Sequence, residues 1–316
     1  MVKLLSKKNS KIEVKIAPVL LLGFRRPTEA LRVFGQIKKA RPSKFFLYVD
    51  GARNKDELRQ VLLVRDIVQR VDWDCEVKTF FREKNSGIKG CLDAIEWFIS
   101  EVGEGIILED DALPTLEFFR FCSELLERYR GDDRIAYING CNFISESSIE
   151  EKDSYYFSKY PTPKGFAIWK SSWRIYDYPM KDYLNFKKSG CLKKIVFDRI
   201  ERLLLGRLLD DAYVGPDGID FRWIYSLLTK GKLAITPSKN LVTDIGFGPG
   251  AANTREVDSY LSKPTKKIKF PLSHPKFMVL DRTLDAKYFR WLFFKKLKKK
   301  ILIKGGFYKI FKARFS

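Results

Sequence analysis

The sequence predicts an α/β protein organised around a doubly wound, mostly parallel sheet. Apolar runs of strand length recur at 18–23, 45–49 and 105–109, and polar or charged residues follow each run. Between them lie stretches of helix length with apolar residues at helical spacing, and the connections are short. Continuous apolar runs are typical of strands buried on both faces, and strand–helix alternation with short connections specifies a parallel sheet.

The first half of the chain supplies most of this alternation. After the first apolar run, Pro27 begins a helix, because proline suits the first helical position. Apolar residues then recur at helical spacing as far as Ile37. The elements expected after it are strand 45–49, helix 54–71, strand 75–81, helix 88–102, strand 105–109, helix 116–130 and strand 134–139.

The second half has a different composition. Aromatic residues crowd the span from Tyr156 to Tyr183, which Pro161, Pro163 and Pro179 interrupt. Aromatic rings bind sugar faces well, but we assign most of these rings to packing. Beyond them we expect an amphipathic basic segment 193–209, a helix 221–228, a strand 233–236 and a stretch 240–244 that runs into the glycine-containing loop 245–253.

Composition indicates a globular protein of a reducing compartment. With 316 residues, 45% of them hydrophobic, the chain can bury a large core. Its five cysteines are odd in number and never spaced C-x-x-C, which argues against a disulfide framework and a zinc site. We see neither a secretory signal nor a run of about 18 uncharged apolar residues, so we expect a cytoplasmic protein. The one histidine, His274, is interpreted as structural.

The formal charge of +21 is concentrated near the C-terminus. The segment from Lys287 to Arg314 alternates bases with aromatic and aliphatic residues, and no acid follows Asp285. A basic amphipathic segment of this kind favours binding to an anionic membrane surface. The alternative is a C-terminal helix packed on the domain with a solvated lysine face. We expect no nucleic-acid partner, because much of the positive charge lies in this one segment, which is also rich in apolar residues.

The run Glu109-Asp110-Asp111 follows the apolar strand 105–109 directly. Ligands of open α/β sheets bind outside the carboxyl ends of the strands, and three adjacent acids there repel one another unless a cation neutralises them. We therefore expect a divalent metal held by Asp111, with Glu109 as a possible second ligand, gripping a diphosphate. Hard oxygen ligands suit Mn²⁺ or Mg²⁺. The alternative is a solvated acidic turn before the helix near Thr115.

Other strand ends carry residues suited to a nucleotide. Arg25 and Arg26 follow the first strand and can hold a base or phosphate, and the alternative is a solvated helix start. Two positive charges at the positive end of a helix dipole are locally unfavourable, which favours the ligand. Asp50 follows the second strand and can accept from a ribose hydroxyl or base N–H, or can simply form an Asp-Gly turn. Neither of the usual glycine-rich phosphate loops is present, so we expect the nucleotide to be bound through a metal.

Three aspartates are candidates for a general base. Asp220 stands at a predicted helix start, where it either caps the helix or takes a proton from an acceptor hydroxyl. Asp217 is its rival, and Asp244, just before the glycine loop, is a weaker third candidate.

Taken in order, four motifs resemble those of one enzyme family. They are Pro18 to Arg26, Asp50-Gly51, the acidic triplet and Asp220 before a tryptophan-containing helix. The chain resembles the GT-A glycosyltransferases, and within them the N-acetylglucosaminyltransferase I-like group. That group is inverting and uses a UDP-sugar and manganese. The resemblance covers residues 17–255 and is firmest at 18–26 and 105–120.

The resemblance implies roles for individual residues. Arg26 matches an arginine at the nucleotide, Asp50 matches the aspartate that binds uracil, and Asp111 matches the metal ligand. Asp220 matches the catalytic base, and the loop 245–253 matches a segment that closes over the donor. The nucleotide-sugar-binding set that we expect is Arg25, Arg26, Asp50, Lys84, Asn85, Glu109 and Asp110.

Two departures accompany the resemblance. The family base lies in a Trp-Asp-Asp-Trp setting, whereas here Asp220 lies between Ile219 and Phe221. Golgi members carry a membrane anchor and disulfides, and we expect neither here, so the resemblance implies a bacterial cytosolic relative.

We expect an N-terminal extension 1–16, a nucleotide-sugar-binding half 17–145, an acceptor-side half 146–260 of the same domain, and a basic tail 261–316.

The expected function is inverting, metal-dependent transfer of GlcNAc or a related sugar from a UDP-sugar to a hydroxyl of a glycan or lipid-linked acceptor. This activity would serve cell-surface polysaccharide synthesis, with the tail holding the enzyme at the inner face of the cell membrane. The alternatives are a sugar-nucleotide pyrophosphorylase and a non-enzymatic nucleic-acid binder.

Overall fold

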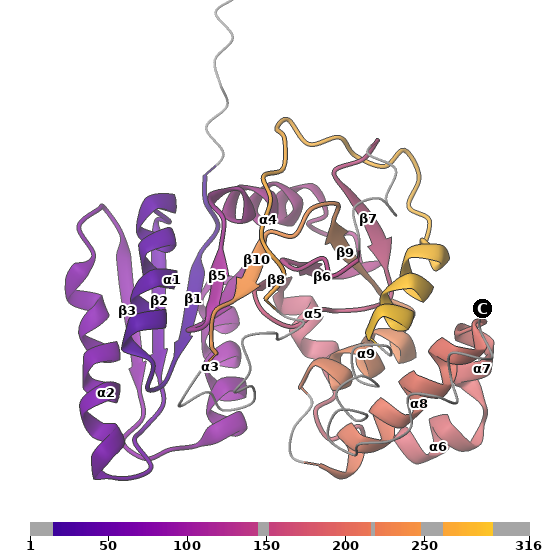
Figure 1. The fold of residues 1–316 in the computed structure, drawn as a ribbon, viewed down its shortest axis with the longest axis horizontal. Coiled ribbons are helices and arrows are strands. Elements are labelled where there is room, and N and C mark those ends of the chain that lie inside the picture. Colours follow the sequence, from indigo (N-terminus) through magenta and orange to yellow (C-terminus); the bar gives the residue numbers. More distant parts are fainter. Residues whose placement is uncertain (1–14, 145–151, 216–218, 248–261, 293–316) are drawn as a thin grey trace, which may run out of the picture.

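A computed structural model describes residues 15–144, 152–215, 219–247 and 262–292. Its centre is an eight-stranded sheet in the order β3-β2-β1-β4-β8-β6-β9-β7, with helices on both faces (Figure 1). Strands β1 to β4 run parallel, as do β6 and β9, whereas β8 and β7 are antiparallel to their neighbours. The prediction of an α/β protein with a mostly parallel, doubly wound sheet is confirmed.

Eight strands form the main sheet and two form a small antiparallel ribbon. The ribbon pairs β10 with β5 and lies beyond the end of β4. The strand bounds are β1 Val19–Gly23, β2 Lys44–Val49, β3 Glu76–Phe81, β4 Glu104–Glu109, β5 Ala112–Pro114, β6 Ile135–Asn139, β7 Tyr155–Ser158, β8 Phe166–Trp169, β9 Leu233–Pro237 and β10 Val242–Asp244.

Helices follow most of the strands, and short polar caps fix where several of them begin. Asn54 caps α2, Thr115 caps α4 and Asp198 caps α8, each accepting a backbone N–H of the first turn. The bounds are α1 Pro27–Ala40, α2 Lys55–Arg65 with a 3₁₀ turn Asp66–Arg70, α3 Gly87–Val102, α4 Leu116–Arg128, α5 Lys170–Ile175, α6 Tyr183–Lys188, α7 Cys191–Ile195, α8 Arg199–Val214 and α9 Ile219–Lys230; residues 282–292 are also helical.

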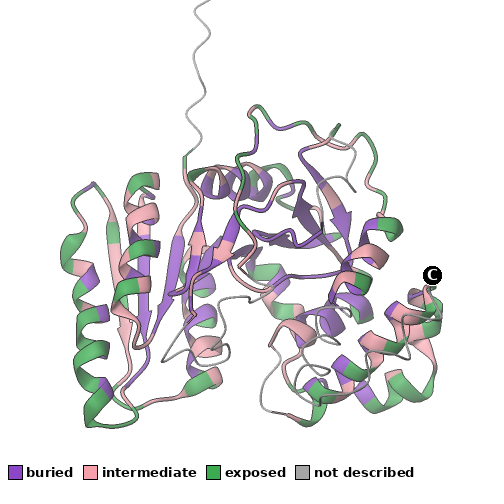
Figure 2. Ribbon diagram, viewed as in Figure 1, coloured by how far each residue is buried: buried purple, intermediate pink, exposed green. Residues whose placement is uncertain are grey.

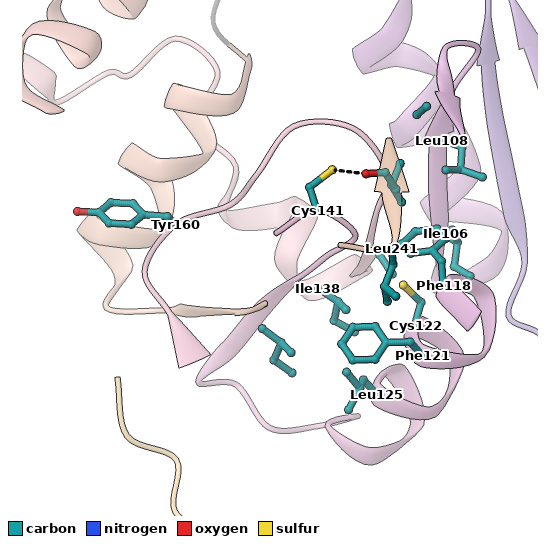
Figure 3. Close-up of a cluster of buried hydrophobic side chains, with 14 of the residues drawn as sticks. Ile106, Leu108, Phe118, Phe121, Cys122, Leu125, Ile138, Cys141, Tyr160 and Leu241 are labelled. Carbon is teal, nitrogen blue, oxygen red and sulfur yellow. Dashed lines mark hydrogen bonds between the residues drawn. The ribbon is translucent and has the colours of Figure 1, made fainter. Parts of the chain in front are cut away.

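The core lies on both faces of the sheet, as the period of a strand requires (Figure 2). Val19 and Leu21 of β1 face the layer formed by α1, α2 and α4, whereas Leu20 and Leu22 face the layer formed by α3 and α9. The first layer includes the aromatic and aliphatic side chains of α4 packed on β4 and β6 (Figure 3). Burial on both sides explains why β1 and β4 appear in the sequence as continuous apolar runs.

The structure differs from the sequence-based expectation mainly in the second half. Strands β7 and β8 fall mostly within the aromatic span and were not predicted. Pro161 and Pro163 lie in the connection between them and interrupt the alternating pattern that would indicate strands. The expected amphipathic basic segment 193–209 is divided between α7 and α8, because Asp198 caps a new helix that begins at Arg199. The small ribbon β5–β10 was also not expected, since its strands have three residues each.

Residues 282–292 form a helix that packs on the domain. Leu284, Phe289 and Leu292 are buried, and the ring of Trp291 stacks on Phe143 with centroids 5.2 Å apart. This part of the predicted tail therefore contacts the core, while the basic run 293–316 lies outside the described residues. No helix in the described ranges has the length and apolar character needed to cross a membrane.

Candidate functional site

The carboxyl ends of β1, β2 and β4 meet at one edge of the sheet. Leu22 is paired with Glu109, and Gly23 is paired with Val49, so the residues just after these strands are neighbours. This register brings Arg26, Asp50 and the acidic triplet together. The ribbon adds Asp244, which lies opposite Ala112. The structure therefore places these predicted site residues at one edge of the sheet.

Asp110 is the buried member of the triplet. It is 8% exposed, and its Oδ2 accepts a hydrogen bond from the backbone N–H of Phe24 at 3.0 Å. Burial, together with the neighbouring negative charge of Asp111, raises the pKa of Asp110 to about 7. Its partner is a backbone group of the adjacent strand end, so Asp110 ties the residues after β4 to those after β1.

Asp111 is held by two cations, one on each carboxylate oxygen. Lys164 Nζ donates to Oδ1 at 2.6 Å, and Arg26 Nη1 donates to Oδ2. Burial disfavours the carboxylate, but the charges and hydrogen bonds of Lys164 and Arg26 outweigh it and lower the pKa of Asp111. Asp111 is therefore ionised near neutral pH and charge-paired inside the protein.

Lys164 is the residue of this site that sequence reasoning missed. Its ammonium also donates to Glu109 Oε2 at 2.7 Å and lies 3.9 Å from Asp244 Oδ2. Burial opposes its charge, but these carboxylates hold the pKa of Lys164 well above its usual range. The run Pro161-Thr162-Pro163-Lys164-Gly165 indicates a turn, but nothing local shows that the lysine meets acids that are distant in the sequence.

Asp244 and Gly246 close the cluster from the ribbon side. The N–H of Gly246 donates to Asp244 Oδ1 at 2.8 Å, and the N–H of Ile245 donates to the carbonyl of Asp111 at 2.9 Å. A Cβ on Gly246 would lie 2.4 Å from Asp111 Oδ2, so this position requires glycine for close approach. Burial raises the pKa of Asp244 above its ordinary value.

Asp50 is buried and organises the loop before α3. Its carboxylate accepts the backbone N–H groups of Ser86 and Gly87 at 2.9 Å each, and the side-chain amide of Asn85 at 3.0 Å. The role observed for Asp50 and Asn85 is thus to hold this loop against the end of β2. Lys84 is exposed in the same loop. Their contact with a nucleotide stays a prediction.

A polar hollow of about 420 Å³ lies beside the acidic cluster. Arg25 lines it and lies 3.4 Å, through Nε, from Glu57 Oε1. Arg26 and Gly246 belong both to the hollow and to the cluster, so the two are continuous. The other lining residues are Pro27, Glu29, Asn54, Asp56, Glu57, Gln60 and Phe247.

Asp220 lies in the first turn of α9 and is half-buried. Burial raises the pKa of Tyr137 well above its usual range, and the charges of Asp220 and Glu109 add to that shift, so both carboxylates lie near this β6 side chain. Arg222 fixes the start of α9 by donating to the carbonyls of Ala212 and Gly215 at 2.6 and 2.7 Å.

Several expected site residues lie partly or wholly outside the described ranges. The rival base Asp217 does, and so does the part of the loop 245–253 that follows Phe247. His274 Nδ1 and the hydroxyl of Tyr155 share a hydrogen bond of 3.0 Å, away from the acidic cluster.

The donor atoms at the cluster fit a divalent cation that is shared with a phosphate. Glu109, Asp111 and Asp244 offer hard oxygens, and with Asp110 they outnumber the two cations Arg26 and Lys164. Across the described residues, no group of three His, Cys, Asp or Glu side chains is placed to hold a metal alone. Ions such as Mg²⁺ commonly use one or two carboxylates plus substrate phosphates, which is the arrangement that this cluster suits.

Comparison with known proteins identifies no family for the chain. No family model matches the chain, and no curated protein matches it. Among solved structures it is similar to residues 1–349 of TarS from S. aureus, with 8% sequence identity and a TM-score of 0.40. The match covers 71% of this chain and 59% of the TarS chain. A likeness of this size carries no argument about function.

Proposed function

We propose that the protein is an inverting, metal-dependent glycosyltransferase that moves a sugar, GlcNAc or a related one, from a UDP-sugar to a hydroxyl of a glycan or lipid-linked acceptor. The observation that carries this proposal is the acidic cluster at the end of β4, continuous with the hollow at Arg25 and Arg26. The sequence resemblance to the GT-A glycosyltransferases supports the choice of reaction.

On this proposal the donor diphosphate lies between the hollow and the cluster. Asp111, with Glu109, would hold Mn²⁺ or Mg²⁺, which supplies positive charge against the leaving diphosphate. Arg26 already lies at both places and would add a guanidinium to the same phosphates. Asp50, Lys84 and Asn85 would bind the nucleoside from the neighbouring strand end.

Asp220 is the proposed general base. Its carboxylate takes the proton of the acceptor hydroxyl while that oxygen forms a bond to the anomeric carbon of the sugar. The bond from this carbon to the phosphate oxygen breaks on the opposite face, and UDP leaves with the bonding electrons. The fixed start of α9, held by Arg222, keeps the base in place for this step.

The test is UDP release in the presence of Mn²⁺ by the full chain and by Asp111→Ala and Asp220→Ala. We expect each variant to lose about 100-fold or more in kcat, since one loses the ligand of the charge-neutralising ion and the other the base. Asp74→Ala, in the turn before β3, is the matched control and should keep full activity. Normal turnover in both site variants would show the proposed mechanism to be wrong.

We further propose that the enzyme works at the inner face of the cell membrane. The support is the basic, aromatic-rich sequence after Lys287, whose positive charges suit anionic lipid. A lipid-linked acceptor would lie at the same surface.

A further inference from the structure

Lys164 holds the central position in the acidic cluster. Its single ammonium contacts Glu109 at 2.7 Å and Asp111 at 2.6 Å, and it lies 3.9 Å from Asp244. Because the carboxylates around it outnumber the cations, the cluster keeps an excess of negative charge even with Lys164 in place. A donor diphosphate would add more negative charge at the same point, which is unfavourable unless positive charge arrives with it.

The backbone at Lys164 is held in an uncommon conformation. Lys164 has a φ of 70° and Gly165 a φ of 69°, both in the left-handed region. The carbonyl of Lys164 accepts from Cys141 Sγ at 3.2 Å, and the carbonyl of Gly165 accepts from the N–H of Gly140 at 2.9 Å. A left-handed lysine is costly and persists where the surroundings enforce it, often at functional sites.

These contacts divide the residue into a fixed and a movable part. The backbone is anchored to the loop after β6, whereas the ammonium is joined to it by four flexible methylene groups and contacts the carboxylates of Glu109 and Asp111. The ammonium can therefore change partners while the chain around it keeps its place.

We propose that Lys164 is the resident counter-cation of the site, which gives up Asp111 and Glu109 to a divalent cation when the donor binds and turns its ammonium to the donor phosphate. It is a positioning residue. When no donor is bound, its ion pairs hold the carboxylates of Glu109 and Asp111 in place in the site. This inference rests on the proposed function. It means that Lys164 and the divalent cation compete for the same carboxylates.

The first test measures Mn²⁺ binding directly, from the electron paramagnetic resonance signal of free Mn²⁺, with the full chain and no donor. Lys164→Met keeps the length of the side chain but removes the charge that competes. It should bind Mn²⁺ at least about ten-fold more tightly than the wild type, whereas the control Lys187→Met, at an exposed lysine of α6, should bind as the wild type does. Equal affinity in the wild type and Lys164→Met, or no binding by either, overturns the proposal.

The second test uses the wild type, because Lys164→Met removes one of the two cations that hold the buried Asp111 and can fail to fold. An amine-acylating reagent is applied with and without Mn²⁺, and modification at Lys164 is measured by mass spectrometry. We expect Mn²⁺ to increase acylation at Lys164 and to leave Lys187 unchanged. Unchanged or reduced acylation at Lys164 overturns the proposal.

Neither test needs sugar transfer, so the inference and the proposed function fail separately. Tighter Mn²⁺ binding by Lys164→Met without UDP release from any UDP-sugar would retain the counter-cation and reject the reaction. Metal-dependent UDP release with unaltered Mn²⁺ binding in Lys164→Met would do the reverse.

Discussion

Asp285 offers a sharp test of the energetics of the fold, away from the proposed site. It lies in the C-terminal helix 282–292 and is 1% exposed. Its carboxylate accepts from Ser158 Oγ at 2.5 Å and from the backbone N–H of Lys159 at 3.2 Å. The ammonium of Lys159 lies 3.8 Å from it but only 2.9 Å from Glu201, so two buried carboxylates share one lysine. Burial raises the pKa of Asp285 to about 7.

The sign of the pH effect follows from this shift. Unfolded Asp has a pKa of about 3.9, so between that value and about 7 the folded protein binds the extra proton. Stability therefore falls as pH rises through this window, by about 2.5 kcal/mol between pH 5 and pH 8. Asp285→Asn cannot titrate, so its free energy of unfolding should lack this part of the decline, whatever the substitution costs at every pH.

The assay is urea unfolding of the wild type and Asp285→Asn at pH 5, 6, 7 and 8. The quantity compared is the difference between the two free energies of unfolding at each pH, because other groups, Asp110 among them, titrate in both proteins. Should the two proteins lose the same stability from pH 5 to pH 8, the buried carboxylate of Asp285 is ionised throughout and the reasoning fails.

Two further predictions concern the site and the tail. Gly246→Ala should destabilise the protein by about 1–3 kcal/mol and reduce UDP release, because its Cβ would lie 2.4 Å from Asp111 Oδ2. The control Gly35→Ala in α1 places a Cβ with nothing within 4 Å and should be neutral or stabilising. Both variants are compared by thermal unfolding and UDP release, and similar behaviour of the two would contradict the prediction. The full chain should sediment with phosphatidylserine vesicles at low salt but not with phosphatidylcholine vesicles. Replacing Lys298, Lys299 and Lys300 by Gln should weaken this binding, whereas replacing Lys187 and Lys188 by Gln should not. Equal binding to both vesicle types would reject the membrane proposal.

The sequence predicted the first half of the fold well for a physical reason. Strands β1, β2 and β4 are buried on both faces, so they form continuous apolar runs, and Pro27, Asn54 and Thr115 mark where the helices α1, α2 and α4 begin. In the second half the strands β7 and β8 have four residues each and run antiparallel to their neighbours, and their order in the sheet depends on partners far away in the chain. Strand β8, for example, inserts between β4 and β6, which no local pattern of Phe166–Trp169 encodes.

The site divides in the same way. That Arg26, Asp50 and Asp111 gather at one edge follows from a general property of parallel strands, and the structure brings them there. That Lys164 lies among the acids depends on the route of the chain between β7 and β8, which is set by long-range contacts such as Cys141 with the carbonyl of Lys164. By sequence, Asp244 was only a third candidate for the general base, and its position beside Lys164 depends on the pairing of the ribbon β5–β10.

The connection from β7 to β8 carries two buried lysines five positions apart, and they face different groups of acids. Lys159 contacts Glu201 of α8 and lies near Asp285 of the C-terminal helix, whereas Lys164 contacts Glu109 and Asp111. The first contact fixes one end of the connection to the helical part of the protein, and the hydrogen bond between Gly165 and Gly140 fixes the other. A connection held at both ends cannot swing as a lid, so rearrangement within this connection on donor binding falls to the side chain of Lys164. The strained backbone at Lys164 is then explained by the direction in which it sends that side chain, because an extended residue there would direct the ammonium elsewhere, leaving Glu109 without this contact and the buried Asp111 with Arg26 alone.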